Sequence, residues 1–322
     1  YPLKPFNALF NFGIYNSLVC LLSYLKYALF PLKNTSSFAK WVTNKFGYKL
    51  YSIFFKSYTE KLWGISADNL SSEFAKQRIK SFSLGQAILE LFFKSKKHKT
   101  LVDKFNYPTK GNGYVYDKML KKFLANNGNI FFNTSLKTIE FKNSQFYVTY
   151  SDNSIGIFDY LTSSMPIDSF LKIFKNYQFD ELKFNLKFRY TILVYSNISK
   201  NNIFKDQWLY IHDENIKSGR ITNFNNWIPE IINKNDGTVL ANEYWSDKEG
   251  YLWNLDDKSL IDICAKDLMK CGFISSKNDV IDYKVIKVPK CYPIYSENYS
   301  NEINEIKEKL KKFNNLNLIG RY

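Results

Sequence analysis

Apolar residues recur along this chain at two spacings, one typical of helices and one of strands. The helical spacing of three and four residues marks the segments 114–124, 259–271 and 301–312. Alternation of apolar and polar residues is clearest at 186–195, and three further segments are predicted as strands: 207–212, 219–224 and 238–245. The pattern therefore predicts a mixed chain with a mixed or antiparallel sheet in its second half.

The first apolar run covers residues 6–30, and its length approaches the roughly 20 residues that a membrane span needs. Polar and flexible residues interrupt it at Asn11, Gly13, Asn16 and Lys26. We therefore expect a buried or surface-lying pair of helices here, with a membrane contact through 6–30 as the alternative.

A compact series of elements fills the stretch from Tyr107 to Pro166. Glycines at 111 and 113 precede the helix at 114–124, and Gly128 is suited to the position that ends it. Strands are predicted at 129–141, 145–150 and 155–162, and the last leads directly into Ser163, Ser164, Met165 and Pro166. Small hydroxyl residues after a strand let a ligand approach the backbone, although the same residues also form ordinary turns.

The composition narrows the possible partners. The chain has 322 residues with 45% hydrophobic and 18% aromatic residues, which excludes a disordered polypeptide. Its net charge of +15 could favour nucleic acid or an anionic membrane, but the lysines are scattered, and Lys94–Lys99 is the one dense run. We expect no nucleic-acid partner, because no nucleic-acid-binding motif is present and the lysine excess also fits a general bias in composition.

Cysteines and histidines are too few and too dispersed for several kinds of site. The cysteines at 20, 264, 271 and 291 lack the spacing of a zinc site or a disulfide framework. The two histidines are His98 and His212, so a histidine-rich metal site or a Ser-His-Asp triad is not expected.

Several motifs together resemble one family. The segment Tyr51–Gly64, the segments 107–166 and 206–227, and the end of the chain at 318–321 resemble the flavoprotein superfamily of amine oxidases, protoporphyrinogen oxidases and UDP-galactopyranose mutases. The resemblance implies an α/β chain in which a partial, discontinuous Rossmann-like FAD-binding domain accompanies a substrate domain of helices and a mixed or antiparallel sheet. In this division, residues 1–105 are the helical part of the substrate domain and 169–285 its sheet part, while 106–168 and 286–322 belong to the FAD-binding domain.

The same resemblance assigns residues to the cofactor FAD. Leu136 would contact its adenine end through the backbone, and the loop of Ser163, Ser164, Met165 and Pro166 would lie beside it. Gly320 and Arg321 would meet the pyrophosphate, where a glycine N–H and an arginine suit a phosphate. No general acid or base is identified, which suits an enzyme whose flavin does the redox chemistry.

Substrate contacts are implied by resemblance at seven positions: Tyr58, Trp63, Arg189, Tyr210, Arg220, Asn223 and Trp227. Structural alternatives stay open for some of them. Trp63 could be a core aromatic at a helix end, with Glu60 and Lys61 solvated. Arg189 and Arg220 could pair with Asp213 or Glu243 across the sheet.

Two departures from the family limit what the chain is expected to do. Phe82 stands where true mutases carry a phosphate-binding arginine, which favours the oxidase-like branch. No GxGxxG occurs, and both ends resemble internal positions of the family, so we expect a fragment that binds FAD weakly or not at all on its own.

Three functions follow in order of preference. The first is an FAD-dependent oxidoreductase that transfers hydride from an unidentified cyclic, aromatic or other small-molecule substrate, and the second is a flavin-dependent sugar-nucleotide enzyme. The third is a non-catalytic fragment that binds a membrane or a partner. We expect a cytoplasmic protein, with residues 6–30 as the segment that could contact the inner membrane.

Overall fold

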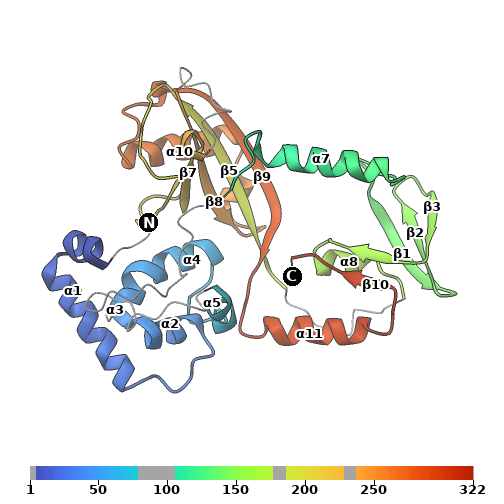
Figure 1. Cartoon of the computed structure of the whole chain (residues 1–322), viewed down its shortest axis with the longest axis horizontal. Helices are drawn as coiled ribbons and strands as arrows, with labels where there is room; N and C mark the ends of the chain where they lie inside the picture. The colour runs from blue at the N-terminus through green and yellow to red at the C-terminus, as the bar shows by residue number, and fades with distance from the viewer. Residues whose placement is uncertain (1–4, 79–105, 177–185, 228–236, 322) are drawn as a thin grey trace. The chain divides into compact units, whose positions relative to one another are not determined.

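A computed structural model describes the chain except for residues 1–4, 79–105, 177–185, 228–236 and 322 (Figure 1). Helices and strands are both abundant, and the predicted α/β class is confirmed. Phe82 and the basic run Lys94–Lys99 lie outside the described residues.

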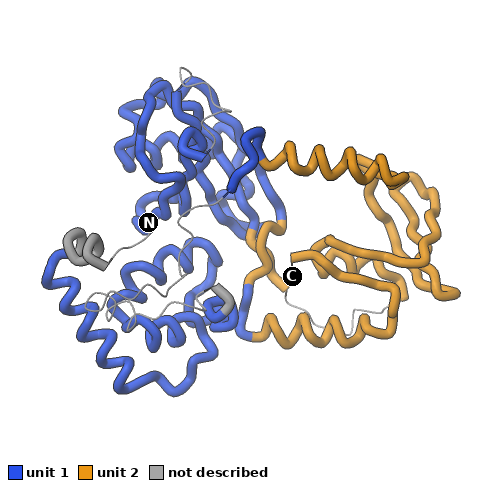
Figure 2. The backbone as a smooth tube through the Cα atoms, viewed as in Figure 1, with its two compact units in different colours: residues 1–111, 190–289, 295–297 blue, residues 112–189, 290–294, 298–322 orange. Residues whose placement is uncertain are grey.

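The chain forms two compact units, and each is assembled from separate stretches of sequence (Figure 2). Unit 1 contains residues 1–111, 190–289 and 295–297, and unit 2 contains 112–189, 290–294 and 298–322. The assignment of chain segments to a flavin domain and a substrate domain stays a prediction.

The helical part of unit 1 begins with the long helix α1 (Pro5–Leu29), on which α2 (Phe38–Phe46) and α3 (Tyr48–Leu50) pack. The π-helix η1 (Tyr51–Lys56), α4 (Ser57–Trp63) and α5 (Ser72–Arg78) complete it. Gly13, with a φ of 74°, interrupts α1, and the Ser37 side chain caps α2 by accepting from the Lys40 N–H. Gly47 separates α2 from α3, and a Cβ there would lie 2.6 Å from the Tyr24 backbone nitrogen. Only glycine therefore allows this close approach to α1.

A five-stranded sheet forms the rest of unit 1, in the order β6-β7-β8-β5-β9. The strands are β5 (Phe188–Ile198), β6 (Trp208–Tyr210), β7 (Arg220–Asn223), β8 (Thr238–Ser246) and β9 (Val280–Pro293). The pairs β6–β7, β7–β8 and β8–β5 are antiparallel. The beginning of β5 (188–189) and the end of β9 (290–293) belong to unit 2. Short helices accompany the sheet: α9 (Phe224–Trp227), η3 (Tyr251–Asn254), α10 (Asp257–Lys270) and η4 (Lys277–Asp279).

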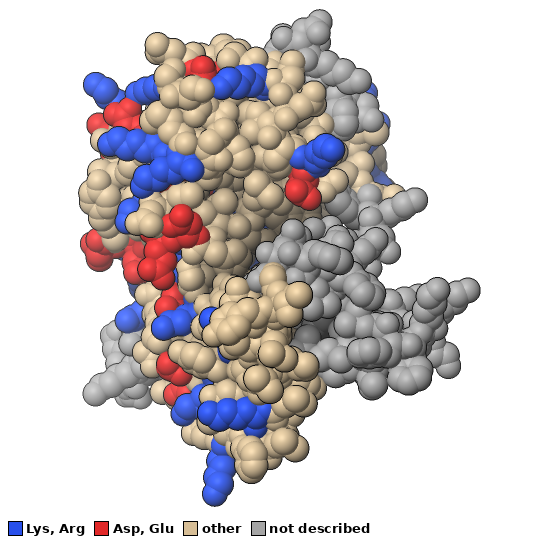
Figure 3. Space-filling model, turned by 90° about the vertical axis from the view of Figure 1, so that its left-hand side faces the viewer, with Lys and Arg blue, Asp and Glu red and all other residues tan. Residues whose placement is uncertain are grey.

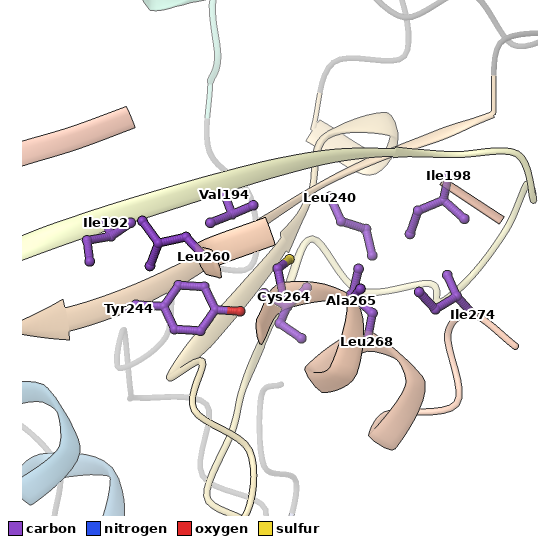
Figure 4. Packing of buried hydrophobic residues seen from close by; sticks show 11 residues of the cluster. Ile192, Val194, Ile198, Leu240, Tyr244, Leu260, Cys264, Ala265, Leu268 and Ile274 are labelled. Carbon is purple, nitrogen blue, oxygen red and sulfur yellow. The ribbon is translucent and has the colours of Figure 1, made fainter. Parts of the chain in front are cut away.

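The core of unit 1 lies between one face of this sheet and α10 (Figure 4). Alternate strand residues such as Ile192, Val194 and Tyr244 meet Leu260 and Cys264 of the helix, and all five are at most 1% exposed. Burial of each large apolar side chain contributes roughly 1.5–3 kcal/mol. The period of two sends the intervening residues to the opposite face, which carries the polar cluster described below.

Within the described residues, unit 2 combines a three-stranded antiparallel sheet, a parallel strand pair and three helices. The sheet is β1 (Leu136–Lys142), β2 (Gln145–Tyr150) and β3 (Ile155–Phe158), and the pair is β4 (Leu161–Ser163) with β10 (Leu316–Leu318). The helices are α7 (Gly111–Ala125), whose first residue belongs to unit 1, α8 (Ile167–Ile173) and α11 (Tyr299–Leu310). Aromatic rings fill the core, where Phe313 lies 5.2 Å from Phe141 and 5.0 Å from Phe174.

Three local predictions in this region were wrong. Residues 129–135 are not a strand, because Asn133 adopts a φ of 54° and Thr134 Oγ1 donates to the Phe132 carbonyl. The strand expected at 155–162 is divided between β3 and β4, which belong to different sheets. Asn127, with a φ of 60°, takes the left-handed position that ends α7, while Gly128 donates to the Phe123 carbonyl.

Candidate functional sites

The parallel pair β4–β10 brings two of the predicted cofactor segments together in unit 2. Leu316, Asn317 and Leu318 pair with Leu161, Thr162 and Ser163, and the Ile319 N–H donates to the Ser163 carbonyl at 2.9 Å. Because parallel strands end at the same edge, the loop at 163–166 and Gly320 lie side by side. The carboxyl edge of parallel strands is where α/β folds bind ligands.

Gly320 is in unusually close contact with this loop. A Cβ at this position would lie 2.9 Å from the carbonyl oxygens of both Ser164 and Met165. A side chain here would force the two strand ends apart, so the contact requires glycine. The result is a stretch of backbone that a flat or extended ligand can approach closely.

Side chains around this edge are already held in place. The Arg321 guanidinium lies 4.9 Å from the centre of the Tyr292 ring, and its Nη1 donates to the Cys291 carbonyl at 3.4 Å. Arg321 is otherwise exposed. Ser163 is buried and its Oγ accepts from the Met165 N–H at 3.3 Å. An exposed, oriented guanidinium next to close-packed backbone suits an anionic ligand.

Leu136 lies elsewhere in unit 2. It is the first residue of β1 and pairs with Tyr150 of β2. Its backbone is thus at the start of the antiparallel sheet. The predicted contact between this residue and FAD stays a prediction.

A second group of candidate side chains lies in unit 1, on the face of the sheet opposite α10. Tyr58 of α4 contacts Tyr210 edge-on at a ring distance of 4.9 Å and Trp245 at 5.7 Å, both nearly perpendicular. Tyr210 pairs with Arg220, and Arg220 pairs with Glu243, in register across β6, β7 and β8. The predicted residues Tyr58, Tyr210 and Arg220 are therefore neighbours.

Arg220 and Glu243 form an ion pair within this group. Arg220 Nε donates to Glu243 Oε1 at 2.7 Å, and Nη2 donates to the same oxygen. Burial raises the pKa of Glu243, and Arg220 opposes that effect. Cross-strand pairing of Arg220, one of the alternatives raised from the sequence, is thus observed. Among the described residues nothing accepts from Nη1, which leaves donors for a ligand.

Two residues of this region escaped the sequence analysis. Lys61 Nζ donates to the carbonyls of Ile211, Asp213, Ile216 and Ser218 at 2.9–3.4 Å, so Lys61 is not solvated as the core alternative for Trp63 supposed. Burial lowers the pKa of Lys61. His212 lies 5.8 Å from the Tyr58 ring, and burial, followed by Lys61, lowers its pKa. Both residues lie within the segments 51–64 and 206–227, but these segments do not reveal the contacts, because the partners come from distant parts of the sequence.

The other predicted substrate residues have structural surroundings. Trp63 is 2% exposed and packs edge-on against Phe74 and Tyr295, as the core alternative expects. Asn223 is buried, and its Nδ2 donates to the Phe204 carbonyl. Whether these residues also meet a substrate stays a prediction.

Trp227 and Arg189 complete the set. The Trp227 ring lies edge-on to Tyr107 at 5.2 Å, and its Nε1 donates to the Gln207 carbonyl at 3.0 Å. Arg189 is 4% exposed and belongs to the part of β5 assigned to unit 2. The predicted substrate contacts of both residues also stay predictions.

The described part of the chain lacks two further features. No cluster of three or more His, Cys, Asp or Glu residues with the geometry of a metal site occurs there. Among the helices that the structure describes, none combines the length and apolar character that crossing a membrane requires.

Comparison with known proteins identifies the fold. No protein-family model matches the chain, and no curated protein matches it. A reduced UDP-galactopyranose mutase superimposes with a TM-score of 0.78 at 17% identity, over 95% of this chain and 67% of that one. A candidate protoporphyrinogen oxidase from Exiguobacterium sp. 255-15 gives 0.70 at 14% identity, over 93% and 66%.

A third structure, a putrescine oxidase variant with redesigned cofactor binding, gives a TM-score of 0.57 at 11% identity, over 94% of this chain and 68% of that one. The chain thus spans about two thirds of each protein. At these identities the similarity establishes a shared fold, and it leaves substrate and reaction open.

Proposed function

We propose that this chain is part of an FAD-dependent oxidoreductase and carries its substrate-binding region together with one edge of its flavin site. The observation that supports this most directly is the contact of Gly320 with the 163–166 loop at the carboxyl end of β4 and β10. Sequence resemblance selected both segments for FAD independently of their distance in the fold. The fold shared with a mutase and two oxidases supports the same proposal.

The residues at this edge suit an FAD molecule. The backbone of Ser163 to Pro166 and of Gly320 would approach the cofactor, and the Arg321 guanidinium would pair with a phosphate. Leu136 would hold the adenine end through its backbone. Bound flavin would supply the redox chemistry, while the protein orients the substrate and excludes water.

For the substrate we propose a small molecule with a flat ring or an anionic group. Tyr58 and Tyr210 offer aromatic surfaces, and Arg220, oriented by Glu243, retains N–H donors for an anion. Trp63, Arg189, Asn223 and Trp227 would contribute indirectly by fixing the surrounding backbone.

A sugar-nucleotide enzyme is the second candidate. The TM-score of 0.78 with a UDP-galactopyranose mutase and the closeness of Tyr58 to Tyr210 and Arg220 favour it. The burial of Trp63 counts against it, because a ring packed between Phe74 and Tyr295 offers no face for a base to stack on.

Amide hydrogen exchange with FAD or UDP added separately tests both candidates. FAD is expected to slow exchange at residues 163–165 and 319–321, and UDP to slow it at 208–222 if the second candidate holds. Gly320→Ala should abolish the FAD effect because its Cβ meets two carbonyls at 2.9 Å. Gly113→Ala is the matched control, since a Cβ there meets nothing within 4 Å.

The outcomes separate the alternatives. Protection by FAD that persists in Gly320→Ala, or that appears outside both segments, would contradict the proposed flavin edge. Protection by UDP alone would move the sugar-nucleotide reading to first place. No protection by UDP at saturating concentration would remove the sugar-nucleotide candidate, whereas weak protection by FAD is what the missing GxGxxG segment leads us to expect of this chain on its own.

A further inference from the structure

The long helix α1 presents an apolar side to solvent. Ile14, Leu18, Leu22, Leu25 and Leu29 recur at intervals of three and four residues and therefore share one side of the helix. Their exposed fractions run from 45% for Leu25 to 86% for Ile14. Tyr15 on the helix and Phe30 directly after its end are also exposed, at 78% and 74%.

The opposite side of α1 is the one that packs on the protein. Cys20 is 7% exposed, and Ser23 Oγ accepts from the Lys49 N–H at 3.1 Å. The close approach of Gly47 to Tyr24 fixes this side against the junction of α2 and α3. The helix therefore turns its more apolar side outwards, the reverse of an ordinary surface helix. A contiguous apolar patch of this kind marks an interaction surface.

The charges of the surrounding sequence indicate the partner. Residues 1–59 contain seven lysines and no aspartate or glutamate. Lys26 lies on α1 itself, and Lys33 follows four residues after its end. Figure 3 views the molecule from the side on which α1 lies and shows Lys and Arg side chains both at the upper left and at the lower end, with Asp and Glu side chains along the left side between them. Two copies meeting through this region would bring like charges together, whereas an anionic surface would complement them.

We propose that the apolar side of α1 docks this protein on the surface of a bilayer containing anionic lipids. The leucines enter the boundary between headgroups and acyl chains, Tyr15 and Phe30 lie at headgroup depth, and the lysines pair with anionic headgroups. The helix lies along the surface, in keeping with the finding that no described helix is suited to crossing a membrane.

Co-sedimentation with vesicles tests the proposal. The unchanged protein is expected to bind phosphatidylcholine vesicles that contain phosphatidylglycerol and to bind pure phosphatidylcholine vesicles weakly. Leu18→Gln with Leu22→Gln should weaken binding roughly tenfold or more, since each leucine loses its apolar contact. Lys26→Gln with Lys33→Gln should weaken binding to the anionic vesicles alone.

The matched control is Ile155→Gln with Ile157→Gln, which removes two exposed apolar residues of β3 in unit 2 and should leave binding unchanged. Equal binding to both kinds of vesicle, or binding insensitive to the leucine change, would overturn the proposal. The proposal would also be overturned if the protein formed a dimer that Leu18→Gln with Leu22→Gln dissociates and did not bind vesicles. Binding of the unchanged protein to the two kinds of vesicle tests the proposal even if a variant fails to fold.

Discussion

His212 lies where a protonated imidazole is unfavourable. Its ring is within 5.8 Å of Tyr58, and its buried Nδ1 has no hydrogen-bond partner among the described residues. Burial and then the nearby Lys61 lower the pKa of His212 below its ordinary value of 6.5. A neutral imidazole is thus part of the native packing around Tyr58 and Tyr210.

The lowered pKa predicts a loss of stability on acidification. Because the pKa of His212 is lower in the folded chain than in the unfolded chain, its contribution to stability is complete above pH 6.5. That contribution is lost as the pH falls through 6.5 towards the pKa of the folded state. Between about pH 7.5 and about pH 5.5 the unchanged protein should therefore lose more of its melting temperature than His212→Gln does.

An NMR titration measures the same effect directly. The sequence has two histidines, so His98→Gln assigns the imidazole signals and serves as the matched variant in the melting experiment. A His212 signal that titrates at or above pH 6.5 would contradict the prediction.

Sequence resemblance found some residues of this group and missed others for a physical reason. Tyr58, Tyr210 and Arg220 belong to recognisable strings, and the structure brings them together. Lys61 and His212 act through contacts with segments about 150 residues away in sequence. Only the fold reveals such contacts, so neither local spacing nor residue type could have assigned them.

At the scale of elements, α4 is fastened to the loop that follows β6. Lys61 Nζ is surrounded by four carbonyl oxygens of residues 211–218, and from the other side Asp267 of α10 accepts from the N–H groups of Lys217 and Ser218. The loop is thereby held between two helices. This arrangement keeps Tyr58 of α4 against Tyr210 at the end of β6.

Lys61→Met should loosen this loop while it preserves the length of the side chain. Four carbonyls lose a charged donor, and leaving such acceptors unpaired costs about 2–3 kcal/mol of unfolding free energy. Chemical denaturation measures that change, and amide exchange at 213–218 should accelerate. Lys56→Met, at an exposed residue of the preceding helical turn, is the control and should change neither.

Helices and strands were predicted correctly where the apolar residues followed a single spacing. The prediction failed where the backbone conformation of one residue ended the pattern. The alternation at 186–195 and the helical spacing at 259–271 correspond to β5 and α10, whose buried faces meet in the core. Residues 129–135 are rich in apolar side chains, yet Asn133 takes a left-handed conformation that no strand continues. Apolar content alone did not reveal that turn.

At the scale of the whole molecule, each unit depends on segments that are remote in sequence. Unit 2 is completed by residues 290–294 and 298–322, which add α11 and β10 to elements that precede residue 190. The strand pair with the candidate flavin edge therefore exists only when the end of the chain is in place. Sequence alone could not supply the contacts that decide which residues form one compact body, and the predicted division into a flavin domain and a substrate domain stays a prediction.

Removal of residues 298–322 should unfold unit 2 and leave unit 1 folded. The deletion takes away β10 and the buried residues Ile303, Ile306 and Phe313, and each such loss costs about 2–5 kcal/mol. Amide protection in β2 should fall by roughly a hundredfold or more, because the rings of unit 2 lose their partner Phe313. Protection in β5 and β8 should persist, since their core is completed by α10 within unit 1.

Phe313→Ala, which keeps the backbone, should lower amide protection in β2 by a smaller amount. Equal loss of protection in β8 and β2 would mean that the two units fold as one, and the truncated chain could then not serve to study the Tyr58 and Arg220 group in isolation.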